Sequence, residues 1–104
     1  MNQALSVWKL KNAEQLSMVL SEITDVKLMQ NFLRDVMTEK EIIEISSRLE
    51  AAKMLSVGEK YEDVVLKTKL SSRTVARISE WLKNGCGGYK KAINIMDNHH
   101  EKTR

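Results

Sequence analysis

Residues 70–83, which read LSSRTVARISEWLK, hold side chains that suit binding to a nucleic acid. Arg73 and Arg77 are four residues apart, so they share one face if this stretch is helical. A guanidinium group is a planar fork that can bridge the two acceptors on a guanine edge or clamp a phosphate. The hydroxyl groups of Ser71 and Ser72, with the open N–H groups of a helix N-terminus, suit phosphate oxygens. The residue types therefore predict contact with a polyanion.

The same stretch and the residues before it match a helix-turn-helix module, in which the second of two short helices lies in the DNA major groove. The apolar positions that would lock the two helices together are Val64, Val65, Leu70, Val75, Ile78 and Leu82. The opposite face of the second helix would carry Ser72, Arg73, Ala76, Arg77 and Glu80. We therefore predict a helix-turn-helix over residues 61–83.

The predicted DNA contacts are of two kinds, those that position the protein and those that read sequence. The residues expected to contact phosphates are Lys67, Lys69 and Lys90, together with the backbone at Ser71 and Ser72. Bases are expected to meet Arg73 and Arg77, with Ala76 small enough to let the helix approach closely. The full set of predicted DNA-binding residues is Lys67, Lys69, Ser71, Ser72, Arg73, Thr74, Ala76, Arg77 and Lys90.

Lys69 departs from the common pattern, which has glycine at this point of the turn. We therefore expect a less favourable or altered turn conformation here, since glycine alone adopts positive φ without steric cost. If the lysine faces DNA, it adds a phosphate contact.

The distribution of charge supports a polyanionic partner. Residues 66–91 contain seven Lys or Arg residues and one acid, Glu80, which gives this window a net charge of +6. The whole chain carries +3, so the remaining residues total −3. Three readings remain open besides DNA: a solvated lysine-rich face, a helical adaptor whose basic face meets an acidic protein, and structured RNA.

Composition favours an all-α fold in one domain, residues 1–96, followed by a frayed tail at 97–104. The 104 residues include no proline and only four glycines, so residues that interrupt helices are nearly missing. Apolar spacing predicts helices over 12 to about 23, 25–37, 38 to about 57, 61–68, 72 to about 84 and 89–96. Asn12 and Ser71 are expected as N-caps, and Thr38 with Glu41 as a capping box. The third helix is expected to bury Ile42, Ile45, Leu49 and Ala52.

Several classes of function are disfavoured by the sequence. Cys86 is a lone cysteine, and His99 and His100 adjoin each other in a polar tail, so neither a metal site nor a nucleophile is expected. The glycine-rich GCGGY lacks the pattern of a nucleotide-binding loop. Since none of these patterns is present, the chain is not expected to be an enzyme. Without a signal peptide or an apolar span at its start, and with a single cysteine, it is expected to be cytoplasmic.

Over residues 29–94 the chain resembles the Trp repressor superfamily, and most closely its YerC/YecD-type branch. The segments SSRTVARISEWLK and GCGGY carry most of this likeness. The resemblance implies a six-helix, intertwined homodimer that binds DNA through two symmetric helix-turn-helix units. Our leading hypothesis is a sequence-specific transcriptional regulator that acts as a repressor at an inverted-repeat operator. A dimer would also explain three amphipathic helices with more apolar surface than a short bundle needs.

The resemblance also implies a corepressor pocket flanked by Arg48 and Arg77. The repressor has small residues just after the second arginine, whereas this chain has Ile78 and Trp81. We therefore predict that L-tryptophan is not the effector and that no cofactor is needed, while a different small-molecule effector stays open. Two alternatives stay open: Arg48 pairs with Glu44 on its own helix, and Arg77 either reads DNA or orders the protein near Trp81 or Glu80.

Overall fold

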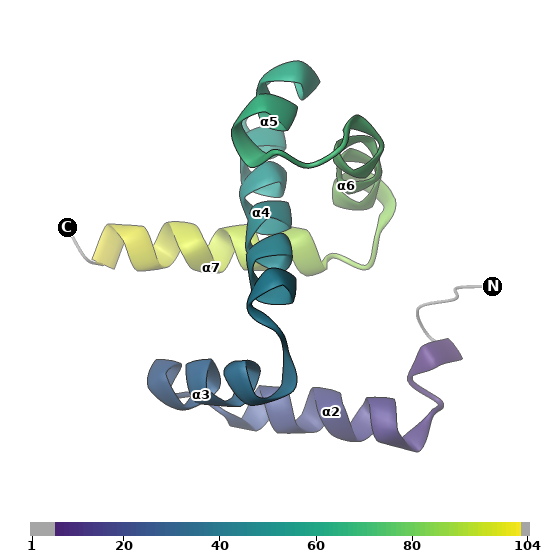
Figure 1. The fold of residues 1–104 in the computed structure, drawn as a ribbon, viewed down its shortest axis with the longest axis vertical. Coiled ribbons are helices and arrows are strands. Elements are labelled where there is room, and N and C mark those ends of the chain that lie inside the picture. Colours follow the sequence, from purple (N-terminus) through teal and green to yellow (C-terminus); the bar gives the residue numbers. More distant parts are fainter. Residues whose placement is uncertain (1–5, 103–104) are drawn as a thin grey trace. The chain divides into compact units, whose positions relative to one another are not determined.

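The computed structural model describes residues 6–102, and side chains through residue 99. Six helices have their bounds in this part of the chain and no strand occurs in it, which confirms the all-α class (Figure 1). Their bounds are α2 Lys11–Glu22, α3 Val26–Val36, α4 Glu39–Ser56, α5 Tyr61–Thr68, α6 Ser72–Asn84 and α7 Gly88–Lys102. None of the helices in this described range is long and apolar enough to cross a membrane.

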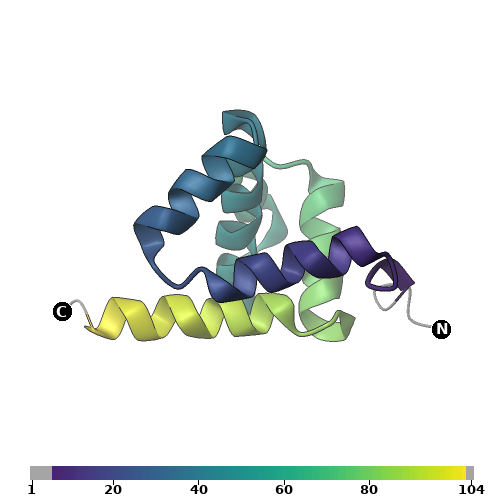
Figure 2. The ribbon, with the colours of Figure 1, turned by 90° about the horizontal axis from the view of Figure 1, so that it is seen from below.

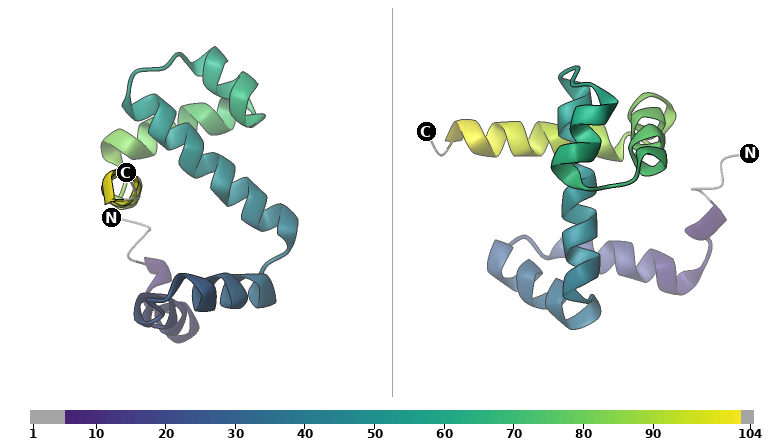
Figure 3. Two further views of the ribbon diagram at one scale, coloured as in Figure 1. Left: turned by 90° about the vertical axis from the view of Figure 1, so that its left-hand side faces the viewer. Right: turned by 45° about the horizontal axis from the view of Figure 1, so that its top comes forward.

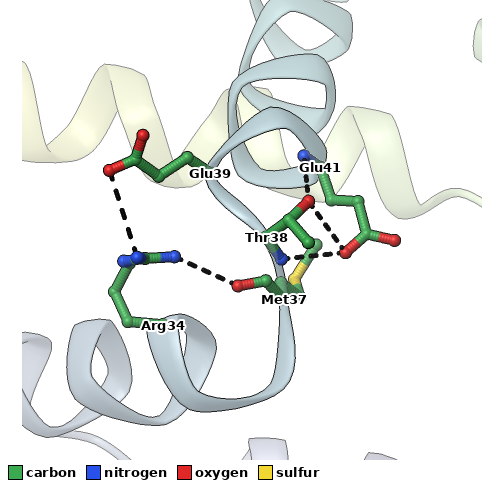
Figure 4. A network of polar contacts seen from close by, with 5 residues as sticks. All are labelled: Arg34, Met37, Thr38, Glu39 and Glu41. Atoms are coloured by element: carbon green, nitrogen blue, oxygen red, sulfur yellow. Dashed lines mark hydrogen bonds and ion pairs between the residues drawn. The ribbon is translucent and has the colours of Figure 1, made fainter.

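The start of α4 is fixed by the predicted capping box (Figure 4). The backbone N–H of Glu41 donates to Thr38 Oγ1 at 3.1 Å, and the N–H of Thr38 donates to Glu41 Oε1 at 2.9 Å. Arg34, near the end of α3, donates to the Met37 carbonyl at 3.1 Å and lies 4.0 Å from Glu39. These bonds satisfy helix-end groups that have no partner inside a helix.

Two helix ends differ from the sequence prediction. α2 begins at Lys11 with Leu10 at the N-cap position and no side-chain cap, so the prediction of Asn12 as N-cap is wrong. α7 continues to Lys102, beyond the end expected at residue 96, because no glycine or proline follows Gly88 to stop it. Residues 103–104 of the expected tail lie outside the described residues.

The chain divides into two compact units, Met1–Ile42 and Ile43–Arg104. In the first unit the chain changes direction at residues 23–25, so α2 and α3 run at an angle to each other (Figure 2). Asp25 caps α3 by accepting from the N–H of Leu28 at 3.0 Å. Neither α2 nor α3 contains a buried residue, and their apolar side chains Leu16, Val19 and Val36 are exposed.

The core lies in the second unit, where α5, α6 and the start of α7 pack on the C-terminal half of α4. Its buried apolar residues are Ala51, Ala52, Met54, Val64, Val75 and Ile78. Partly buried residues that pack against them are Leu55, Val65, Leu70, Leu82, Tyr89 and Ile93. All six apolar positions predicted to lock the helix-turn-helix therefore belong to this core or its edge.

The predicted buried face of α4 is mostly wrong. Ala52 is buried, but Ile45 is 49% exposed and Ile42 and Leu49 are only partly buried. The buried residues concentrate near the C-terminal end of α4, at Ala51, Ala52 and Met54. Two adjacent alanines there let the neighbouring helices approach closely.

Candidate nucleic-acid interface

α5 and α6 are joined by the three-residue turn 69–71, seen as one short bend in Figure 3. Thr68 organises this turn because its hydroxyl donates to the Val64 carbonyl at 2.7 Å and accepts from the N–H of Leu70 at 3.3 Å. Leu70 is partly buried against the core. The hydrogen bonds of the Thr68 hydroxyl and the packing of the Leu70 side chain therefore hold the turn in place.

Lys69 lies in this turn with φ 64° and ψ 16°, the left-handed conformation. Its N–H donates to the Val65 carbonyl at 2.8 Å and so closes the end of α5. This conformation costs a residue with a Cβ about 1–2 kcal/mol. The prediction of a less favourable turn conformation at Lys69 is confirmed, and the lysine side chain is exposed there.

α6 has two contrasting faces. Val75 and Ile78 are fully buried, while Ser72, Arg73, Ala76, Arg77 and Glu80 are exposed as the spacing predicts. Within residues 6–99 neither Arg73 nor Arg77 has an ion pair. The carboxylate of Glu80 instead accepts from Asn84 Nδ2 at 2.8 Å. Two guanidinium groups therefore remain available on one exposed helix face.

The N-terminus of α6 adds backbone donors to this face. Ser71 is the N-cap, as predicted: its hydroxyl accepts from the N–H of Thr74 at 3.1 Å and donates to Thr74 Oγ1 at 3.0 Å. The N–H groups of Ser72 and Arg73 have no acceptor among the described residues. They lie at the positive end of the helix dipole, which favours a bound anion. The Ser71 hydroxyl, in contrast, already donates to and accepts from Thr74, whereas the hydrogen of the Thr74 hydroxyl takes no part in these bonds.

The three predicted lysine anchors differ in their surroundings. Lys67 Nζ lies 4.0 Å from Glu50 Oε2, so its charge is partly balanced within the protein. Lys69 and Lys90 are exposed, and neither has an ion pair in the described part of the chain. Lys90 comes from the first turns of α7 and lines a cavity with Lys83, a feature that the helix spacing alone does not reveal.

The two arginines predicted to flank a ligand pocket are engaged differently. Arg48 Nη2 donates to Glu44 Oε2 at 2.7 Å, which confirms the alternative of a pair along α4. Its Nε is buried and has no acceptor among the described residues. Neither Arg48 nor Arg77 is among the residues that line the cavity at Lys90 or the one at Trp81.

The two bulky residues that follow Arg77, Ile78 and Trp81, differ in burial. Ile78 is fully buried in the core, whereas Trp81 is 45% exposed. Trp81 lines a cavity of about 450 Å³ together with Leu49, Gly85, Cys86, Gly88, Tyr89 and Ala92. Among the described side chains no group of three His, Cys, Asp or Glu residues could hold a metal ion. The side chain of His100 lies outside the described residues.

With this geometry in hand, the chain can be compared with known proteins. The model of the family described as Trp repressor protein matches residues 11–97. The chain belongs to the Trp repressor family. The match spans α2 to α6 and most of α7, so the candidate interface lies inside the part shared with the Trp repressor family.

Two similar proteins support this assignment. Uncharacterized protein YerC from Bacillus subtilis (strain 168) is 30% identical over 84 residues, which cover 81% of each chain. A solved structure of a TrpR like protein from Eubacterium eligens ATCC 27750 is 32% identical. It superposes with a TM-score of 0.80 and covers 88% of this chain and 95% of its own. The resemblance to a YerC-type, Trp repressor-related protein is confirmed.

Proposed function

We propose that this protein is a sequence-specific, DNA-binding transcriptional repressor that inserts α6 into the major groove. The observation that carries the proposal is the pair of exposed guanidinium groups, Arg73 and Arg77, without ion pairs in the described chain. They lie one turn apart, beside the open N–H groups at the N-terminus of α6. Membership of the Trp repressor family supports the same function.

Each group has a distinct role in this proposal. Arg73 and Arg77 read bases because a guanidinium fork matches the O6 and N7 acceptors of guanine. The N–H groups of Ser72 and Arg73, with Lys69 and Lys90, contact phosphates. Lys67 contributes less than expected from sequence, since Glu50 lies 4.0 Å from its ammonium group.

We propose that the protein binds DNA as a homodimer. Apolar side chains of the first unit are exposed in the single chain, among them Leu16, Met18, Val26, Leu28 and Val36. Such surface is costly to leave in water, and a symmetric partner is the common way to cover it. Two copies of α6 would then meet half-sites about 34 Å apart, one turn of B-DNA. The matching operator is an inverted repeat.

We also propose that L-tryptophan is not the effector. Ile78 takes up core volume directly beside Arg77, and Arg48 is already paired with Glu44. Isothermal titration calorimetry with free L-tryptophan should give no saturable heat. Saturable binding at micromolar concentration would contradict this part of the proposal.

Fluorescence anisotropy with labelled duplex DNA tests the proposed function over a series of salt concentrations. The logarithm of the binding constant should fall linearly with the logarithm of salt, by about 0.9 per phosphate contacted. Replacing Arg73 and Arg77 together by alanine should abolish preference among duplexes. Arg34→Ala, which removes an arginine of the first unit that already contacts Met37 and Glu39, is the matched control. Equal binding to an acidic polypeptide such as polyglutamate would favour the adaptor instead.

A further inference from the structure

The cavity lined by Lys83 and Lys90 has a volume of about 410 Å³ and lies in the second unit, on the side of α6 that does not carry Arg73 and Arg77. Its volume is within the range of sites that bury small organic ligands. The lining residues come from the end of α4, from α6 and from α7: Leu55, Ser56, Ser79, Leu82, Lys83, Lys90 and Ile93. Leu55, Leu82 and Ile93 are partly buried against the core and give the cavity an apolar wall.

Ser79 offers a hydroxyl to this cavity. The residue is only 8% exposed, yet its side chain makes no hydrogen bond within the described residues. A helical serine or threonine often donates to the carbonyl four residues earlier, as Thr68 does to Val64 in this protein. Ser79 does not do so with Val75. The hydroxyl oxygen of Ser79 is not itself fully buried, so it opens onto the cavity and can donate to a ligand there.

The charged residues at the cavity are all positive. Lys83 and Lys90 are exposed and have no ion pair within residues 6–99, and none of the lining residues is an acid. Two ammonium groups beside an apolar wall favour a ligand that joins an anionic head to an apolar body. A bare anion would make no contact with the apolar wall, and a neutral apolar molecule would make no hydrogen bond or ion pair with the lysines and Ser79.

We propose that this cavity binds a small amphipathic carboxylate as an effector. The apolar body contacts Leu55, Leu82 and Ile93, and the carboxylate accepts from Lys83, Lys90 and the Ser79 hydroxyl. This site differs from the pocket expected between Arg48 and Arg77, since neither arginine lines it.

The regulatory consequence rests on the proposed function. Lys90 is one of the proposed phosphate contacts, so a carboxylate beside it would neutralise a charge that DNA otherwise meets. The base-reading face of α6 would stay open, so ligand and DNA can bind together with a lowered affinity. The coupling is reciprocal: DNA lowers the affinity for the carboxylate by the same factor.

Calorimetry on the full chain tests the site without DNA. Octanoate is expected to bind saturably, and octanamide, its neutral counterpart, about tenfold more weakly because a charge-assisted hydrogen bond is lost. Inorganic phosphate, which lacks the apolar body, is expected to bind more weakly than octanoate. Equal affinity for octanoate and octanamide, or for octanoate and phosphate, would overturn the site.

Two neighbouring lysines give a matched pair of variants. Lys90→Met removes the cavity charge and should weaken octanoate binding about tenfold, whereas Lys91→Met removes a charge outside the cavity and should leave it unchanged. Ser79→Ala should weaken octanoate binding as well. Equal effects of Lys90→Met and Lys91→Met would indicate general charge attraction and overturn the site.

The same octanoate titration, repeated by anisotropy on the DNA complex, separates the two proposals. A loss of DNA affinity in the wild type but not in Lys90→Met supports the effector role. Octanoate binding with unchanged DNA affinity would overturn that role while the site stands. If no duplex is bound at all, the proposed function fails, and the calorimetric result on the cavity is unaffected.

Discussion

Replacing Lys69 by glycine is expected to stabilise the protein. Lys69 has φ 64° and ψ 16°, a conformation that costs a residue with a Cβ about 1–2 kcal/mol and glycine almost nothing. Glycine also gains freedom in the unfolded chain, which offsets about 0.4–1 kcal/mol of that gain. The net expectation is a rise of about 0.5–1 kcal/mol in the free energy of unfolding.

A series of three substitutions isolates the backbone effect. Lys69→Ala removes the ammonium group but keeps the Cβ, so it should leave stability near that of the wild type. Lys69→Asn should fall between alanine and glycine, because asparagine tolerates the left-handed conformation better than other residues with a Cβ. Urea unfolding followed by tryptophan fluorescence measures all four proteins, at one protomer concentration because the stability of a dimer depends on it.

DNA affinity should change in the opposite direction. Lys69→Ala and Lys69→Gly each remove one proposed phosphate contact, so each should lower the slope of log affinity against log salt by about 1. Glycine at position 69 would then make the fold more stable and the complex weaker. If Lys69→Gly is no more stable than Lys69→Ala, the left-handed turn is not the conformation in solution and the reasoning is refuted.

Three further predictions concern the N-cap of α6, the Arg48–Glu44 pair and the base-reading role proposed for Arg73. Ser71→Ala removes the N-cap of α6 and should lower the free energy of unfolding in urea by about 1 kcal/mol. Ser72→Ala is the control: the Ser72 side chain has no hydrogen bond in the described chain, so the free energy of unfolding should change by less than about 0.5 kcal/mol. A double-mutant cycle on Arg48 and Glu44 should give a coupling free energy of about 0.3–0.5 kcal/mol for unfolding, and this value should decrease in high salt. A coupling free energy well above about 1 kcal/mol would contradict an exposed ion pair. Arg73→Ala should cost about 1–3 kcal/mol of affinity for a preferred duplex and relax specificity at one base position; uniform weakening across sequences would assign Arg73 to the phosphates.

The parts of the fold that the sequence predicts best are those governed by local signals. α5 and α6 have the predicted bounds, because Ser71 caps α6 and Lys69 ends α5 in a left-handed turn. The Thr38–Glu41 box starts α4 as predicted, since both of its bonds join residues three apart. The match of the apolar positions of the helix-turn-helix to the core follows from helical spacing alone.

Features that depend on how helices pack are not predicted. The apolar residues of α4 are spread around the helix without forming one clear face, so spacing cannot tell whether Ile45 or Met54 contacts the neighbouring helices. The cavity at Ser79 and Lys90 joins residues of α6 and α7 that only the fold brings together. The partial neutralisation of Lys67 by Glu50 likewise depends on the position of α5 against α4.

Selection of bound fragments from a random duplex library at physiological salt, followed by sequencing, tests the central proposal most directly. We expect enrichment of an inverted repeat whose half-sites are centred about one helical turn apart. The Arg73→Ala, Arg77→Ala double variant should enrich none. Failure of the folded wild-type protein to enrich any sequence would contradict sequence-specific reading by α6.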